Sequence, residues 1–345
     1  MNQKTINEWF SNNTCNINST VQKTKFFKKY FCLDWKDYKN YDISWTDIKP
    51  THFTYEKKIK LKEYNEEIVL IGNIQYEHKN PVSLILDKNS FSTNNVSFLK
   101  SHLQKCIRLG IIDKSIITGY IFMENNIIEF LRRLPIIILE DVHIIQDLDI
   151  IVWFMIMSDI ITIPESFKKW CIYLIKFLCA LKKKNFYNKF VQNKDINYDN
   201  LDNLESRNKS TIYSLMIRKS YGGMKGDMLM LNYIIDEWIK KLNTGSKLEI
   251  INAKNITIIN TLHPDLYELS AVDFHCYPKI LDILHYHYQQ YDIETIKKTI
   301  WIKSSSINYR VNHDNTDEVI NICWKTIKHK LFRIQKKFIT NNIIK

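Results

Sequence analysis

Glycine is scarce in this chain, and this scarcity constrains the fold more than any other feature of the sequence. Only 7 of the 345 residues are glycine, and 6 are proline. Folds with many tight turns, or with glycine-rich loops that cradle phosphate, need more residues that tolerate positive φ. The composition therefore favours helices. Hydrophobic residues make up 45% of the chain, which allows a sizeable core in one large or two modest domains.

From residue 97 onwards, apolar residues recur at the spacing of a helix. Leu99, Leu103 and Cys106 are four and three positions apart, and Gly110 is placed as a helix stop. The same pattern predicts further helices at 114–133, 135–160, 165–184, 209–221, 225–242, 277–300 and 316–340. The polar stretch at 185–210 is predicted to be a mobile loop within this helical domain, which spans 97–345.

The pattern between Phe53 and Leu86 is that of strands. Ile59 and Leu61 alternate with lysines, and residues 68–71 are rich in β-branched side chains. We therefore predict a small α/β segment at 25–96 that contains a β-meander. The expected fold class is mainly α (α+β), with this small N-terminal β-meander followed by a large helical body.

The first ten residues carry a compact motif. Gln3 is followed by Ile6, and then by the adjacent aromatic residues Trp9 and Phe10. Within one helical turn the three apolar side chains project to a common side and form a plug on a polar segment. Residues 11–20 are polar, so residues 1–24 are predicted to be a disordered tail. The plug fits a pocket on another protein or, alternatively, the core of this chain itself.

This motif resembles the PIP box, the peptide that docks proteins onto the sliding clamp PCNA. That pattern is a glutamine, two free positions, an aliphatic residue, two free positions and two aromatic residues, and Gln3, Ile6, Trp9 and Phe10 fill its four defining positions. The resemblance implies a PCNA-type sliding clamp as a partner. It also implies that the protein works in the nucleus or in a viral replication compartment.

The charge balance favours a polyanionic partner such as DNA. There are 49 Lys and Arg against 37 Asp and Glu, a formal net charge of +12. A lysine-rich codon bias would produce the same excess, so a merely basic surface is the alternative. The candidate nucleic-acid-binding residues are Lys25, Lys28, Lys29, Arg132, Arg133, Lys225, Lys328, Arg333, Lys336 and Lys337.

Two of these basic groups have a recognisable setting. Residues 23–31 mix cations with aromatic residues, a pattern that suits single-stranded nucleic acid and fits an amphipathic helix equally well. In the last predicted helix, an apolar stripe that includes Cys323, Ile327 and Leu331 is expected to face the core. The lysines of that helix fall largely on its other side, either to contact phosphates or simply to be solvated.

Residues 97–142 carry a second pattern. A helix with His102, Lys105 and an Arg-Leu-Gly end is followed by Arg132–Leu134, five residues and Glu140–Asp141. This resembles the helical C-terminal part of RarA-type replication-fork ATPases, which are related to clamp loaders. Their ATPase module has a Gly-x-x-x-x-Gly-Lys-Ser/Thr loop that is absent from this sequence. The resemblance therefore implies a helical scaffold at replication forks without ATP hydrolysis.

The charged pairs of that pattern also have a structural interpretation. Arg132 and Arg133 each lie eight positions before one carboxylate, Glu140 or Asp141 respectively, so they can form a salt-bridged network on one helical face or between neighbouring helices. The glycine-rich stretch at 221–227 is open to two interpretations as well. It binds a backbone phosphate through its amides and Lys225, or it simply joins two helices. The methionines next to it, Met224, Met228 and Met230, are predicted to fill the core.

The candidates for catalysis centre on Asp273 and His275. On a strand these two side chains would share a face, where they could bind a divalent metal or exchange protons. Glu140, Asp141 and Glu268 are the supplementary carboxylates that a metal-dependent nuclease would need. The structural alternative is that Asp273 caps a helix or pairs with a buried arginine, and that His275 is a core histidine.

The cysteines and the apolar runs bound the remaining classes. The seven cysteines are scattered without a Cys-x-x-Cys pair, so we expect neither a disulfide framework nor a zinc site. A reducing intracellular compartment follows. The longest apolar run, Ile150–Met157, is far shorter than the roughly 18 residues of a membrane span, so no membrane association is expected.

Together these patterns predict a DNA-binding accessory protein of replication or repair, tethered to a sliding clamp and without a cofactor. We favour the prediction that the protein is not an enzyme. The alternative is a clamp-recruited, metal-dependent nuclease, and only that alternative calls for a divalent metal. A third prediction is a protein-binding adaptor with no affinity for DNA.

Overall fold

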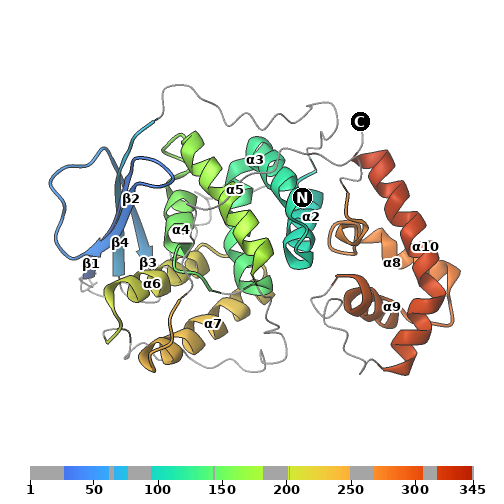
Figure 1. The fold of residues 1–345 in the computed structure, drawn as a ribbon. Coiled ribbons are helices and arrows are strands. Elements are labelled where there is room, and N and C mark those ends of the chain that lie inside the picture. Colours follow the sequence, from blue (N-terminus) through green and yellow to red (C-terminus); the bar gives the residue numbers. More distant parts are fainter. Residues whose placement is uncertain are drawn as a thin grey trace, which may run out of the picture.

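The computed structural model shows a mainly α protein with a small N-terminal sheet, as the sequence predicted. The sheet lies at one end of the molecule, the helical body follows it, and α8 to α10 form the other end (Figure 1). The structure describes residues 27–61, 66–76, 95–142, 144–181, 201, 203–248, 267–305 and 317–343. Outside this described part lie the clamp-binding candidates Gln3, Ile6, Trp9 and Phe10, the candidate Lys25, and most of the predicted loop at 185–210.

Four strands form the sheet. They are β1 (Phe27–Trp35), β2 (Tyr41–Thr46), β3 (Tyr55–Leu61) and β4 (Glu66–Ile74). The last two form the predicted antiparallel hairpin. The strand order is β2-β1-β4-β3, and β1 runs parallel to β4, so the sheet is more than the chain of consecutive hairpins that a meander implies.

β1 corrects one sequence prediction, because residues 27–31 form a strand and not an amphipathic helix. Side chains alternate between the two faces of a strand, and here both faces are covered. Phe31 and Leu33 enter the main core, whereas Tyr30 packs against Val69 and Ile71 on the opposite face. The aromatic rings of Tyr30 and Phe31 are buried, so they offer no surface on which a base could stack.

The lysines of β1 follow the same alternation. Lys28 is exposed and lies 3.4 Å from a Glu67 carboxylate oxygen on β4. Lys29 points the other way, and its ammonium donates a hydrogen bond to the Tyr213 hydroxyl on the helical side. Of these two candidate nucleic-acid contacts, Lys29 therefore has a structural role in joining the sheet to a helix.

Tryptophan side chains join the sheet to the helices beneath it. The Trp153 indole donates a hydrogen bond to the Phe31 carbonyl at 3.2 Å, and the Trp45 indole donates to the Ser210 hydroxyl at 2.8 Å. Gly72 on β4 makes the first of these contacts possible. A Cβ atom at that position would lie 2.5 Å from the Trp153 ring, which no side chain tolerates.

The helical body packs against this sheet. Its helices are α2 (Val96–Leu109), α3 (Ile112–Asp141), α4 (Leu148–Met157), α5 (Glu165–Ala180), α6 (Ser206–Ser220) and α7 (Lys225–Asn243). Gly110 ends α2 in the left-handed region at φ 69°, as its position in the sequence predicted. Every residue of α4 is buried, so this helix is the centre of the core.

α3 differs from the prediction of two helices separated at Pro135. The helix continues through Pro135, and its backbone departs from helical geometry earlier, at Asn126 with φ −159° and ψ 80°. The Asn126 side chain accepts a hydrogen bond from the Glu129 amide at 3.0 Å, as an N-cap does. The second half of α3 thus begins at a capping asparagine and tolerates the proline inside it.

The C-terminal region has a small core of its own. It consists of α8 (Lys279–His287), α9 (Ile293–Ile300), a π-helical turn (Trp301–Ser305) and α10 (Glu318–Asn342). The helix predicted at 277–300 is divided, because Asp292 caps the start of α9 through the Thr295 amide at 2.7 Å. The buried stripe of α10 includes Cys323, Ile327 and Leu331, as predicted. None of the helices in the described ranges is both long and apolar enough to cross a membrane.

Candidate functional site: a basic cleft beside an aromatic hollow

A cleft of about 680 Å³ opens between α2, α3 and the segment that joins α6 to α7. We call it the arginine cleft, after Arg108, Arg132, Arg133 and Arg218. Six cationic side chains line it, and three carboxylates, of Glu129, Glu140 and Asp227, stand against them. The cations are Lys100, Lys105, Arg108, Arg132, Arg133 and Arg218. The lining therefore carries more positive than negative charge.

The α2 wall of the cleft is a stripe of polar side chains on a helix that is mostly buried. Ser101, Gln104, Lys105 and Arg108 are three or four positions apart, so they share one side of the helix, and all four are buried. Arg108 donates from Nε to Asp141, and its Nη2 lies 3.6 Å from a Glu140 carboxylate oxygen. A buried guanidinium needs such partners, because an unpaired buried charge is very costly.

The α3 wall confirms the predicted salt-bridged network only in part. Arg133 lies 3.6 Å from a Glu140 carboxylate oxygen and donates a hydrogen bond to the side-chain amide oxygen (Oε1) of Gln104. Asp141, in contrast, pairs with Arg108 on the neighbouring helix. Arg132 pairs with Glu129 at 2.8 Å and lies at the rim, where about a third of its side chain is exposed.

Arg218 gives the cleft its least compensated charge. Its guanidinium donates to the Arg132 carbonyl at 3.0 Å and to the Gly222 carbonyl at 2.9 Å, and among the described residues no carboxylate lies within ion-pair distance. Burial first, and then the charges of Arg132 and Arg133, lower the pKa of Arg218 to about 10, although the negative charge of Asp227 acts in the opposite direction. Three guanidinium groups thus share one corner of the cleft, and a phosphate there would relieve their repulsion.

The loop from Tyr221 to Met224 joins α6 to α7 and lies on the cleft wall. Met224 is 61% exposed, which contradicts its predicted role in the core, whereas Met230 is buried as predicted. Lys225 is exposed at the first position of α7, between two residues that line the cleft. It therefore lies at the rim of the cleft.

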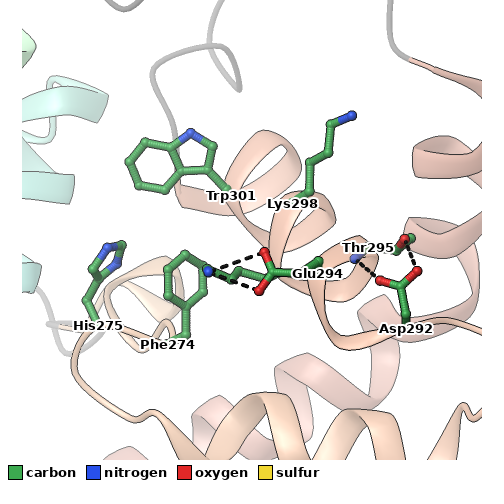
Figure 2. Close-up of a pocket in the computed structure, with 8 residues that line it drawn as sticks. Phe274, His275, Asp292, Glu294, Thr295, Lys298 and Trp301 are labelled. Atoms are coloured by element: carbon green, nitrogen blue, oxygen red, sulfur yellow. Dashed lines mark hydrogen bonds and ion pairs between the residues drawn. The ribbon is translucent and has the colours of Figure 1, made fainter.

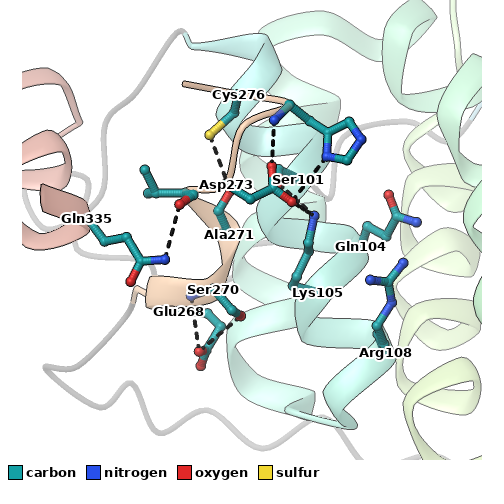
Figure 3. Close-up of polar contacts among 12 residues, drawn as sticks. Ser101, Gln104, Lys105, Arg108, Glu268, Ser270, Ala271, Asp273, Cys276 and Gln335 are labelled. Atoms are coloured by element: carbon teal, nitrogen blue, oxygen red, sulfur yellow. Dashed lines mark hydrogen bonds and ion pairs between the residues drawn. The ribbon is translucent and has the colours of Figure 1, made fainter. Parts of the chain in front are cut away.

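The two catalytic candidates meet at the base of the cleft, although not on a strand. Asp273 and His275 lie in a turn after a short 3-10 helix (Leu269–Ala271), with Asp273 Oδ2 3.2 Å from His275 Nδ1. The buried partner of Asp273 is Lys105, at 2.8 Å, and not an arginine (Figure 3). His275 is not a core histidine, because about half of its side chain is exposed.

The charge of Asp273 is set by these partners. Burial by itself raises the pKa of a carboxyl, but the Lys105 ammonium and the His275 imidazole together hold the pKa of Asp273 well below its usual range. Asp273 Oδ1 also accepts the His275 backbone amide at 2.8 Å. The carboxylate stays ionised, and it fixes both Lys105 and the turn that carries His275.

His102 holds this turn against α2 from the other side. Its Nε2 accepts a hydrogen bond from the Glu268 amide at 2.8 Å, so the proton is on Nδ1, which donates to the Thr118 hydroxyl at 2.7 Å. Burial lowers the pKa of His102 to about 3. This neutral imidazole is a structural link between α2, α3 and the segment that leads to Asp273.

A second depression of about 570 Å³ adjoins the arginine cleft. We call it the aromatic hollow, because Phe274, His275 and Trp301 form one side of it (Figure 2). The ring centroids of Phe274 and His275 are 4.4 Å apart, and those of His275 and Trp301 are 5.8 Å apart. Lys297 and Lys298 of α9 also line it.

His275 and Trp301 line both depressions, so the two meet at this pair of rings. The Arg108 guanidinium lies 5.7 Å from the Trp301 ring centroid, within the range of a cation–π contact. The junction therefore places an aromatic face directly beside the buried cations of α2.

The structure brings together part of the predicted site. Arg132, Arg133, Glu140 and His275 line the arginine cleft, Lys225 lies at its rim, and Asp141 and Asp273 lie behind it as partners of Arg108 and Lys105. The basic residues of α10 are elsewhere, on the helix at the outer edge of the molecule (Figure 1). These are Lys328, Arg333, Lys336 and Lys337, and none is among the described residues that line either depression.

Within the described ranges, no group of three or more His, Cys, Asp and Glu side chains is arranged to hold a metal ion. Comparison with protein-family models, with curated proteins and with solved structures finds no match to this chain.

Proposed function

We propose that this chain is a DNA-binding accessory protein of replication or repair, tethered to a PCNA-type sliding clamp through Gln3, Ile6, Trp9 and Phe10. The observation that carries the DNA-binding part is the arginine cleft, where six cations face three carboxylates. The clamp-binding part rests on the spacing of the N-terminal motif.

The rim of the cleft is suited to exchange one anion for another. Glu129 pairs with both Lys100 and Arg132, and all three side chains are between a quarter and about a third exposed. Partly exposed ion pairs contribute little to stability, so a DNA phosphate can replace Glu129 at low cost. The deeper Arg133 and Arg218 then add positive potential behind the first contact.

A tether and a basic cleft reinforce each other. Phosphate contacts give affinity that depends on salt and tolerates any sequence, and such affinity is modest at physiological ionic strength. Binding to a clamp that encircles DNA raises the local concentration of DNA without a new contact. The tail would thus recruit the protein to the clamp, and the cleft would bind the DNA.

The DNA-binding part is tested with two charge-matched double variants of the full chain. Lys100→Gln with Arg132→Gln removes two cleft-rim cations, and Lys328→Gln with Lys336→Gln removes two from α10. We expect the first pair to weaken DNA binding and to reduce the slope of log affinity against log salt by about 2. We expect the second pair to leave both unchanged. The reverse result would show that DNA binds to the outer face of α10, and it would overturn the proposal that DNA binds in the cleft.

The tether is tested by a pull-down with the cognate clamp. Trp9→Ala with Phe10→Ala should abolish capture, because it removes the apolar plug. Thr5→Ala with Asn7→Ala, at free positions of the same motif, should leave capture intact. Equal capture by both double variants would show that the motif does not dock this protein on the clamp.

One observation favours a second candidate, a metal-dependent nuclease. Glu140 and His275 line the same cleft, and Asp273 contacts His275. Incubation of labelled DNA with the protein and Mg²⁺ or Mn²⁺ separates the two functions. Cleavage that Asp273→Asn abolishes in a protein that remains folded would favour the nuclease over the accessory protein.

A further inference from the structure

The aromatic hollow contains aromatic ring faces, which a surface that binds only phosphates does not need. Phosphates are recognised by cations, whereas a ring face such as that of Trp301 recognises another π surface. In a duplex each base is already stacked on its neighbours, and its faces are closed to protein. Only an unpaired strand offers a base whose face is free to stack.

The position of Trp301 brings the two kinds of chemistry within one nucleotide of each other. The Arg108 guanidinium lies over the Trp301 ring in the arginine cleft, and the His275 ring is edge-on to it at the border of both depressions. Trp301 is the first residue of the π-helical turn that follows α9, a type of turn that is rare and often found at functional sites. Phe274 lies 6.5 Å from Trp301 between ring centroids and extends the aromatic side.

Cations line both of the depressions that meet at this aromatic junction. In the hollow, Lys297 and Lys298 are about half exposed, and their carboxylate partners Glu294 and Asp317 are exposed as well. Those pairs are screened by water and exchange readily with phosphate. In the arginine cleft lie the rim cations. A chain of alternating base and phosphate groups has the complementary pattern.

We infer that the arginine cleft and the aromatic hollow together bind single-stranded DNA, with a base stacked on Trp301 and phosphates on the lysines of α9 and the rim cations of the cleft. This rests on the proposed function and names the form of DNA that the same site takes. The strand passes from one depression to the other across His275 and Trp301.

The first test measures binding of the full-length protein to a labelled 20-mer of deoxythymidine and to a 20-base-pair duplex at the same salt. We expect the single strand to bind more tightly. Trp301→Ala should weaken single-strand binding by roughly 5- to 100-fold, the range for loss of one stacked base, and leave duplex binding unchanged. Trp301→Phe should restore most of the affinity, because it keeps a ring face.

An abasic 20-mer separates stacking from charge, because it has the same phosphates and no bases. It should bind the unmodified protein about as weakly as the 20-mer of deoxythymidine binds Trp301→Ala, and Trp301→Ala should weaken it no further. Phe332→Ala on α10 is the matched control, since it removes a 40% exposed ring that lines neither depression. It should change nothing.

A second variant guards against misfolding of Trp301→Ala. Lys297→Gln with Lys298→Gln alters only exposed charges and should lower single-strand affinity at low salt.

A competition experiment tests the length of the site. Millimolar deoxythymidine monophosphate should fail to displace the 20-mer, because one nucleotide spans only part of the site. Full displacement would show that the site is a mononucleotide pocket and would overturn the inference. Duplex binding that equals single-strand binding, with no effect of Trp301→Ala, would overturn the inference and leave the proposed function standing. Absence of binding to either DNA at low salt would overturn both.

Discussion

Two buried carboxylates, in two different regions of the molecule, have pKa values that are shifted in opposite directions. Asp149 lies between the sheet and α6, where Arg207 Nη1 is 2.9 Å from its Oδ2. Asp273 lies behind the arginine cleft, where Lys105 is 2.8 Å from its Oδ2. Burial raises the pKa of Asp149 to about 7, despite its contacts with Arg207 and Ser210. The pKa of Asp273 lies well below its usual range.

The difference lies in the partner and not in the distance. Lys105 is itself buried, with 5% of its side chain exposed, and Asp273 is its carboxylate partner. Arg207 is 31% exposed and also lies 3.8 Å from Asp147, whose negative charge disfavours ionisation of Asp149. A buried carboxyl stays charged when its cation is buried with it, and it tends to keep its proton when its cation is solvated and shared.

The largest effect on stability is expected when the buried Lys105–Asp273 ion pair is broken. Asp273→Asn keeps the shape of the side chain and leaves the Lys105 ammonium buried without a counter-charge. We expect a loss of about 3 to 5 kcal/mol in the free energy of unfolding, measured by urea denaturation at pH 7.5.

The double variant Lys105→Met with Asp273→Asn is the control for that experiment. It removes the cation as well, so it should recover much of the lost stability. If the double variant is as unstable as the single one, the loss comes from the turn at 273–276 and not from the unpaired charge.

The next effect concerns the pH dependence of stability. A carboxyl whose folded pKa is raised stabilises the fold below its unfolded pKa of about 4, and this contribution is lost as pH rises towards 7. His102 acts in the opposite sense. The pKa of His102 is about 3 in the folded protein, so its contribution to the stability of the fold is complete above about pH 6.5 and is lost as pH falls. Between about pH 4 and 6.5 the two contributions cancel.

Asp149→Asn should therefore expose the acid sensitivity that Asp149 masks. We expect its free energy of unfolding to fall by up to about 1.4 kcal/mol for each pH unit below 6.5, where the unmodified protein is nearly flat. Denaturation curves at half-unit steps between pH 4 and 7 measure this. Parallel profiles for the two proteins would show that Asp149 does not titrate in that window.

The smallest effect comes from a pair with a similar distance and much less burial. Lys297 Nζ lies 3.2 Å from a Glu294 oxygen, but 80% of the Glu294 side chain is exposed. Glu294→Gln should change the free energy of unfolding by no more than about 0.5 kcal/mol, and less in 0.5 M salt. A larger change would mean that contact distance, and not burial, controls these pairs.

Features with a local cause were predictable from the sequence. Gly110 ends α2 because its missing Cβ allows a left-handed backbone, and the stripe of α10 is buried because its spacing matches one helical face. The pairing of β1 with β4 was not predictable, since their partners, such as Phe31 and Leu70, are far apart in the sequence. The pattern of residues 27–31 fits both periodicities, and tertiary packing decided between them.

The candidate site was predictable to the extent that charge was visible. Arg132, Arg133 and Asp273 stood out because charged residues interrupt apolar runs. Lys105 and Arg108 carried an unused signal, a polar stripe on one side of an apolar helix that demands buried partners. Trp301 carried none, because a single tryptophan in a helical stretch is usually core, and only the fold places it beside Arg108.

The parallel pairing of β1 also bears on how the protein responds to force. β1 is an inner strand, bonded to β2 on one side and to β4 on the other, and the N-terminal tail with the proposed clamp-docking motif precedes it in the sequence. A pull on that tail loads the sheet along the strand. Both ladders of hydrogen bonds must then yield in shear together, whereas an edge strand would peel away one bond at a time. The N-terminal segment thus joins the body at a mechanically strong point of the sheet.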